Sequence, residues 1–293
     1  MVDQEAADLL ADIARAGVGP RVARYLSDEL ERVFTAIHTD AADTQYQPEE
    51  IAPRVDALLE ATEGMVRLSA VAGYWAPPST TRVWAGILTA LVPGRRSGGV
   101  SDVWDQLAFY PAVLVAYTFG IGASAARRSD QLAWLFATAL PNDRNEWRPL
   151  VELIHPYTIN ERVGLQLRDA QFKLSPLSDH LHVITRPFFQ ELLPRNEHFE
   201  REFDRFELLG SLARYGLSGA RGAEAWILLG RVLRLGRYED NVSRKLLEAE
   251  AGPLQGDREL LRLMGCDPSA LDETIDGFHA AVGKQMSQVL FIR

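Results

Sequence analysis

The chain has 293 residues, 47% of them hydrophobic, which is enough to bury a sizeable core in one large domain or two smaller ones. Its 40 acidic and 31 basic residues give a net charge of −9, so the chain lacks the basic footprint of a nucleic-acid-binding protein. A single cysteine, Cys266, excludes an internal disulfide and any metal site built from several thiolates. These features favour a globular protein of a reducing compartment.

The basic residues are almost all arginine, because Lys173, Lys245 and Lys284 are the only lysines. Together with the abundance of alanine, this bias is typical of a GC-rich bacterial genome. The N-terminal residues are acidic where a signal peptide would be basic. We therefore expect a bacterial protein that stays in the cytoplasm.

Apolar residues recur at helical spacing through the first 92 residues. The clearest stripe follows Pro20 and predicts one helix as far as Ile37. Shorter stripes predict helices over residues 6–13, 51–65 and 80–92. The helices over 6–13, 20–37 and 51–65 could form an antiparallel bundle.

The loop at residues 95–99 has the sequence RRSGG, which has little to pack against a core. We place a soft boundary there, between an N-terminal helical subdomain at 1–94 and a C-terminal helical subdomain at 100–293. One continuous domain is the alternative.

Residues 106–126 form a run of twenty-one residues without a charge. This run is about as long as the apolar segment of a membrane-spanning helix. Pro111, two tyrosines and two glycines interrupt it, however, and the solidly apolar part covers only 107–121. We predict a buried core helix that forms a hairpin with a second helix over 129–140.

The remaining chain also reads as helices. Residues 150–154 predict a short helix ended by Pro156, whereas 157–178 fit either a strand at 163–167 or a helix at 160–171. A helix capped by Asn196 carries three phenylalanines on one face and breaks at 216–222.

A last amphipathic helix begins at Asp267 and carries an apolar stripe of Leu271, Ile275, Phe278, Val282, Met286 and Val289. Acidic pairs such as Glu29/Glu31 and Glu200/Asp204 are expected on solvated helix faces. The predicted fold is all-α, a multi-helix bundle or helical-hairpin array of about ten to thirteen helices.

Ser124 lies in the stretch GIGASAA, a relaxed form of the nucleophile elbow of hydrolases. The elbow requires a strand before the serine, together with a histidine and an acid brought close by the fold. The candidate histidines are His155, His180, His182 and His279. Small residues packed between two helices are the structural alternative, which we favour.

Two other groups of residues have weaker chemical potential. His180 and His182, beside Asp179, could bind a metal from a strand, but the surrounding sequence favours a helix, on which the two rings diverge. Cys266 precedes a helix start and is interpreted as a structural thiol. We therefore expect no metal and no cofactor.

Aromatic and arginine residues are concentrated in the middle third of the chain. Arginine offers planar paired donors and aromatic rings offer stacking, so such a group could bind a small anion. The candidate ligand-binding residues are Arg127, Arg128, Arg144, Trp147, His155 and Tyr157. A tryptophan-rich core with arginines at its rim is the alternative.

The string YPAVLVAYTFGIGA from Tyr110, followed by RRSDQLAWL from Arg127, resembles a helical hairpin in the C-terminal regions of bacterial multidomain defence proteins. In those proteins the helical region is attached to sirtuin-like or Schlafen-type effector domains. The resemblance covers about thirty residues and brings no catalytic residue with it. It implies a helical sensor or assembly module.

From these observations we expect a non-catalytic helical module that binds a protein partner or self-associates, without nucleic acid or membrane. A role in bacterial anti-phage defence follows from the resemblance. A serine hydrolase using Ser124 and a small anionic-ligand-binding regulator are the alternatives.

Overall fold

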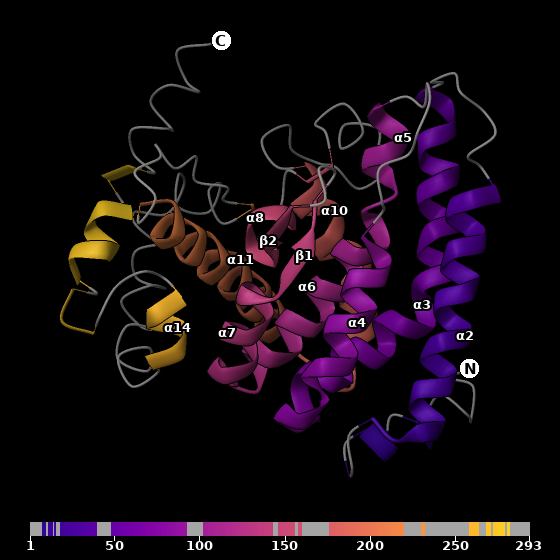
Figure 1. Ribbon diagram of the computed structural model, residues 1–293, viewed down its shortest axis with the longest axis horizontal. Helices are drawn as coiled ribbons and strands as arrows, with labels where there is room; N and C mark the ends of the chain where they lie inside the picture. The colour runs from indigo at the N-terminus through magenta and orange to yellow at the C-terminus, as the bar shows by residue number, and fades with distance from the viewer. Residues whose placement is uncertain are drawn as a thin grey trace.

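The computed structural model describes residues 8–9, 11–13, 15, 18–39, 48–92, 102–142, 146–155, 158–159, 176–219, 230–231, 258–263, 268–270, 272–278 and 280–281. These residues form ten α-helices, four short 3₁₀ turns and one two-stranded antiparallel hairpin. The all-α fold predicted from the sequence is therefore confirmed (Figure 1).

The α-helices are α2 (Pro20–Thr39), α3 (Ile51–Trp75), α4 (Thr81–Leu91), α5 (Asp102–Leu107), α6 (Tyr110–Ala125), α7 (Ser129–Ala137), α8 (Leu150–Leu153), α10 (Pro176–Thr185), α11 (Asn196–Gly219) and α14 (Arg258–Leu263). The strands are β1 (Ala139–Pro141) and β2 (Trp147–Pro149). The 3₁₀ turns are η1 (Pro48–Glu50), η2 (Pro78–Thr80), η3 (Arg186–Phe189) and η4 (Pro268–Ala270).

Helix α6 lies at the centre of the fold, as the charge-free run predicts (Figure 1). Every residue from Tyr110 to Ser124 is buried, because other helices surround α6 on all sides. The stretch Val103–Ala125 is long and apolar enough to cross a membrane, but 94% of its most apolar window is buried inside the protein. Such burial is typical of a core helix.

Close helix contacts explain the glycines of this central layer. A Cβ atom on Gly122 would collide with the carbonyl oxygen of Ala70, so α3 and α6 touch backbone to backbone. The same two helices share a hydrogen bond of 2.6 Å between the hydroxyls of Ser69 and Thr118. On another face of α6, a Cβ atom on Gly120 would collide with the ring of Phe206 from α11.

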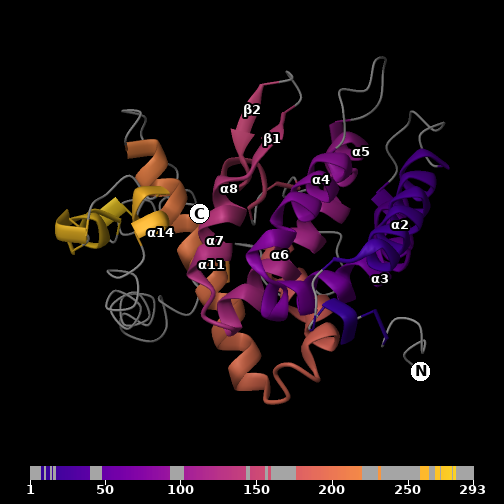
Figure 2. The same cartoon turned by 60° about the horizontal axis from the view of Figure 1, so that its bottom comes forward.

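Helices α2 and α3 lie side by side in both views (Figures 1 and 2). Glu29 of α2 is 1% exposed, which corrects the prediction that this acidic residue lies on a solvated face. Gly64 of α3 leaves the space that its carboxylate occupies, and Arg32 pairs with it at 2.9 Å. Burial raises the pKa of Glu29, whereas Arg32 opposes this rise.

The hairpin of α6 and α7 is present, but α7 ends at Ala137 rather than at residue 140. Leu140 belongs instead to β1, where Ala139 pairs with Pro149 and Pro141 pairs with Trp147. The sequence analysis placed residue 140 in a helix and predicted no strand here, because the strands are only three residues long. A period-2 pattern cannot be recognised over three residues.

The core is continuous through α3 and α6, which lie on either side of the predicted boundary at 95–99. The loop itself lies outside the described residues, so the division into subdomains 1–94 and 100–293 stays a prediction. The undecided segment 160–171 also lies outside them. Near the C-terminal end, Phe278 is fully buried and its ring meets that of Tyr215 on α11.

Candidate functional site

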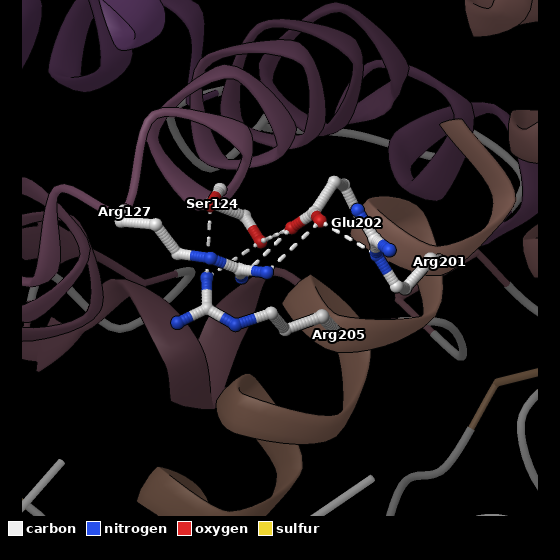
Figure 3. Close-up of polar contacts among 5 residues, drawn as sticks. All are labelled: Ser124, Arg127, Arg201, Glu202 and Arg205. Atoms are coloured by element: carbon white, nitrogen blue, oxygen red, sulfur yellow. Dashed lines mark hydrogen bonds and ion pairs between the residues drawn. The ribbon is translucent and has the colours of Figure 1, made fainter. Parts of the chain in front are cut away.

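Ser124 belongs to a buried polar cluster between the end of α6 and the middle of α11 (Figure 3). Its hydroxyl donates to Oε2 of Glu202 at 3.0 Å and accepts from Nη1 of Arg205 at 2.9 Å. The same Arg205 nitrogen donates to the carbonyl oxygen of Ser124. All three residues are at most 2% exposed.

Arg127 completes this cluster from the turn after α6. It holds a left-handed conformation, with φ of 57°, at the position where glycine usually ends a helix. The amide of Arg128 bonds the carbonyl of Ala123, and that of Arg127 bonds the carbonyl of Ser124, as in a Schellman cap. The guanidinium of Arg127 then pairs with both carboxylate oxygens of Glu202, at 3.1 and 3.3 Å.

Arg128 ties the same turn to the end of α3. Its Nη1 donates to the carbonyl oxygen of Ala76, and the side-chain amide of Gln131 donates to that oxygen at 2.7 Å. Arg127 and Arg128, both expected at a ligand site, are therefore held by contacts within the fold.

The geometry around Ser124 does not match a nucleophile elbow. The elbow requires a strand before the serine, but residues 110–125 form an α-helix. The serine is 0% exposed, and its hydroxyl bonds a carboxylate and a guanidinium rather than an imidazole. The favoured interpretation of GIGASAA was a set of small residues packed between helices. The structure agrees with it, because this stretch belongs to the buried helix α6.

The other predicted ligand-binding residues do not meet in one place. Trp147 is 62% exposed on β2, and His155 lies beyond α8. Arg144 and Tyr157 lie outside the described residues. Arg127 and Arg128 instead bond Glu202 and Ala76, Trp147 lies on β2, and His155 follows α8.

His180 and His182 lie on helix α10, as the sequence favoured. Nε2 of His180 is 2.7 Å from the hydroxyl of Tyr110, whereas the ring of His182 packs against Phe199 and Phe203. Among the residues that the structure describes, no group of three His, Cys, Asp or Glu side chains could hold a metal ion. Cys266 and His279 are outside that part of the chain.

A concave site that is open to solvent lies between α6, α7, α8 and α11. We call it the α8–α11 pocket. Its apolar walls come from Phe136, Leu150, Val151, Ile154, Phe206 and Gly210, and its polar lining comes from Tyr117, His155, Glu207, Ser211 and Arg214. A mostly apolar pocket with a few polar groups is the usual form of a small-molecule site.

Glu207 is one of the lining residues of the pocket and is almost fully buried. Ser178 donates to both of its carboxylate oxygens, at 2.7 and 2.8 Å, and Tyr117 donates to Oε1 at 3.0 Å. Burial raises the pKa of Glu207 to about 8, the bond from Ser178 opposes the rise, and the nearby Asp204 carboxylate adds to it. Glu207 is therefore mostly uncharged at neutral pH.

His155 and Arg214 line the same pocket. Burial lowers the pKa of His155 to about 3, and the positive charge of Arg214 lowers it further, so the imidazole is neutral. Arg214 donates from Nη1 to the carbonyl oxygen of Glu152 at 3.0 Å and to that of Val151 at 3.5 Å. These bonds fix α8 against α11.

The residue pattern pointed to His155 as a ligand-binding residue, but it did not point to Glu207, Tyr117 or Arg214. Asp204 was assigned to a solvated face, yet it and Glu207 are both buried, because α11 is enclosed by other helices and not only along its phenylalanine stripe. Tyr117, a tyrosine in a charge-free core helix, was the feature of the sequence that could have indicated a buried polar partner. A buried hydroxyl needs a partner, so Tyr117 pointed to a polar group facing α6.

The chain matches no protein-family model, no curated protein and no solved structure at a significant level. The class of protein is therefore defined by its own fold and sites, as an all-α protein with a buried arginine–glutamate cluster and a mostly apolar pocket beside α8.

Proposed function

We propose that this chain is a non-catalytic helical module that binds a protein partner, or a second copy of itself, through the hairpin of β1 and β2. The observation that carries the proposal is the exposure of Trp147. At 62% it is the most exposed large hydrophobic side chain in the described part of the protein. Tryptophan is enriched among the residues that contribute most to protein–protein binding.

The hairpin is well anchored to the helical body, from which it projects in Figure 2. Leu140 on β1 is fully buried, and the amide of Leu150 donates to the carbonyl of Thr138 at 2.7 Å. At the other end, the amide of Asn142 donates to the carbonyl of Glu146 at 2.9 Å. An anchored arm loses little conformational entropy on binding, which favours affinity.

The residues immediately before and after Trp147 form an ion pair. Arg148 pairs with Glu146 at 2.9 Å, and both side chains are about half exposed. Because successive residues of a strand point to opposite faces, this pair lies on the face of the hairpin opposite Trp147. The face that carries the indole is therefore left without these two charges.

The hairpin of α6 and α7 supports the further proposal of a role in bacterial defence, because residues 110–135 carry the resemblance to helical regions of defence proteins. In this proposal the effector domain belongs to the binding partner or to a longer natural chain. Expression with neighbouring genes should reduce phage plaque formation, and Trp147→Ala should abolish this reduction. Equal plaque counts with and without the chain would contradict the defence role.

Photo-crosslinking tests the binding surface directly. We would place p-benzoylphenylalanine at position 147 and, as a control, at the exposed position Glu60 on α3, in cells of the native host. The proposal predicts one discrete crosslinked species from position 147 and none from position 60, with mass spectrometry distinguishing a partner from a second copy. No adduct at 147, or the same adducts at both positions, would contradict it.

A further inference from the structure

Trp147 turns its backbone groups toward the outer edge of the hairpin. The amide of Asn142 donates to the carbonyl of Glu146, and hydrogen-bonded pairs recur at every second residue along two antiparallel strands. Glu146 and Arg148 therefore point their backbone groups toward β1. Trp147, which lies between them, points its N–H and C=O away from β1. Among the residues that the structure describes, this edge of β2 has no partner strand.

The two edges of the hairpin differ in their surroundings. Strand β1 contacts α4, whereas β2 lies on the side away from α4 in Figure 2. The sheet has only two strands of three residues each, and sheets become stable in water with three or more strands. The outer edge of β2 is therefore the place where a further strand can be added.

Pro149 restricts the register of such an added strand. Like Trp147 it occupies an outward-pointing position of β2, but proline has no N–H to donate. Trp147 is therefore the residue of β2 that offers both a donor and an acceptor at this edge. Two β2 strands that place Trp147 opposite Trp147 form both hydrogen bonds of the pair, whereas placing Trp147 opposite Pro149 forms only one.

The charges beside Trp147 match a second copy of the same strand. With Trp147 opposite Trp147 in two antiparallel strands, Arg148 of each copy stands opposite Glu146 of the other, and opposite charges in this position are stabilising. A shift by two residues places Arg148 opposite Arg148, or Glu146 opposite Glu146, which is destabilising. Both side chains are about half exposed, so they can be reached by the second copy. The edge is therefore complementary to itself in one register.

We propose that two copies of this chain join through the outer edges of their β2 strands, antiparallel about a two-fold axis at Trp147, to form one four-stranded sheet. The two indoles lie side by side on one face, with their Cα atoms about 5.5 Å apart. The four charges of Glu146 and Arg148 form a network on the other face. This inference rests on the proposed function, because it makes a second copy the partner that Trp147 binds.

The test exchanges the charges at this edge. Glu146→Arg places arginine opposite Arg148 of the second copy, and Arg148→Glu places glutamate opposite Glu146. Each variant alone should therefore dimerise about tenfold more weakly than the wild type. In a mixture of the two variants, the arginines of one chain stand opposite the glutamates of the other, and dimerisation should return.

Sedimentation equilibrium over a range of concentrations measures the mass. The wild type should rise from 32.6 kDa toward twice that mass. Glu60→Arg, an equal charge change at an exposed position of α3, is the control and should dimerise like the wild type. If circular dichroism shows that a charge variant is unfolded, Glu146→Cys and Arg148→Cys replace the pair in a chain that carries Cys266→Ser. Their mixture should then form a disulfide-linked dimer that neither variant forms alone.

A wild-type chain of constant mass at all concentrations, or a mixture no heavier than either folded variant alone, would overturn the inference. Photo-crosslinking at position 147 separates this result from failure of the proposed function. A crosslink to a different protein, with a monomeric wild type, overturns the shared sheet and leaves the binding function in place. No crosslink at all, with a monomeric wild type, overturns both.

Discussion

Arg205 donates from one nitrogen to both the carbonyl and the hydroxyl oxygen of Ser124, at 3.0 and 2.9 Å, so a side chain of α11 closes the last turn of α6. A cation near the C-terminal end of a helix also meets the negative end of its dipole. Glu202 is the carboxylate that balances the arginines around this turn (Figure 3). The cluster therefore joins the two central helices.

Removing that carboxylate should destabilise the fold strongly. Glu202→Ala removes the charge-assisted hydrogen bonds of a buried carboxylate whose ion-pair partners Arg127 and Arg201 are about half exposed, which should cost about 3 kcal/mol. Ser124→Ala removes a neutral hydroxyl together with its hydrogen bonds to Glu202 and Arg205, and it should cost about 1–2 kcal/mol. Urea denaturation of both variants measures the difference, and equal losses of unfolding free energy would contradict this account of the cluster.

The turn after α6 provides a second comparison. Arg127→Gly loses the ion pair with Glu202 but relieves the left-handed backbone, whereas Arg127→Ala loses the pair and keeps the strain. We therefore expect the glycine variant to be more stable than the alanine variant by about 1 kcal/mol. Thermal denaturation tests the order, and a more stable alanine variant would contradict it.

The raised pKa of Glu207 predicts a specific pH dependence. Because its folded pKa of about 8 lies above the unfolded value of 4.5, the folded state binds more protons between these values, and stability falls as pH rises. The lowered pKa of His155 makes stability rise with pH instead, but only below pH 6.5, because its pKa is about 3 in the folded state and 6.5 in the unfolded state. The window from pH 6.5 to 8 therefore isolates Glu207 from His155.

In that window the unfolding free energy of the wild type should fall by up to about 1.4 kcal/mol per pH unit through Glu207 alone. Glu207→Gln should remove this contribution, whereas Glu200→Gln, an exposed position on the same helix, should keep it. Urea denaturation at several pH values measures the slope. A slope unchanged in Glu207→Gln would show that this carboxyl does not titrate as stated.

Phe278 tests the role of the C-terminal stripe. Its side chain is fully buried against Tyr215, so Phe278→Asp should cost several kcal/mol and lower the melting temperature sharply. Glu273→Gln, at an exposed neighbouring position, should have little effect. A Phe278→Asp variant that stays folded but loses mass in light scattering would place the stripe at an interface between copies instead.

Burial explains which features could be predicted from the sequence. Helix α6 was predictable because twenty-one residues without a charge must avoid water. Helix α11 was predicted as a helix, but its acidic residues were placed on a solvated face. The phenylalanine stripe alone does not reveal that partner arginines are supplied by the turn at Arg127 and by residue 231.

The candidate site was predictable only in part. His155 lines the α8–α11 pocket, but Arg127 and Arg128 serve the end of α6, and the groups that complete the pocket come from α6 and α11. Tyr117 and Arg214 are almost a hundred positions apart in the chain. Their proximity depends on helix packing, which local patterns do not encode.

The binding function depends most directly on Trp147, so sedimentation in native extract is the decisive measurement. Fluorescently labelled wild-type chain, followed by analytical ultracentrifugation in extract of the native host, should sediment as a complex larger than the monomer. Trp147→Ala should sediment as the monomer with an unchanged melting temperature, because the indole is mostly exposed. Identical sedimentation of the two folded proteins would contradict the account.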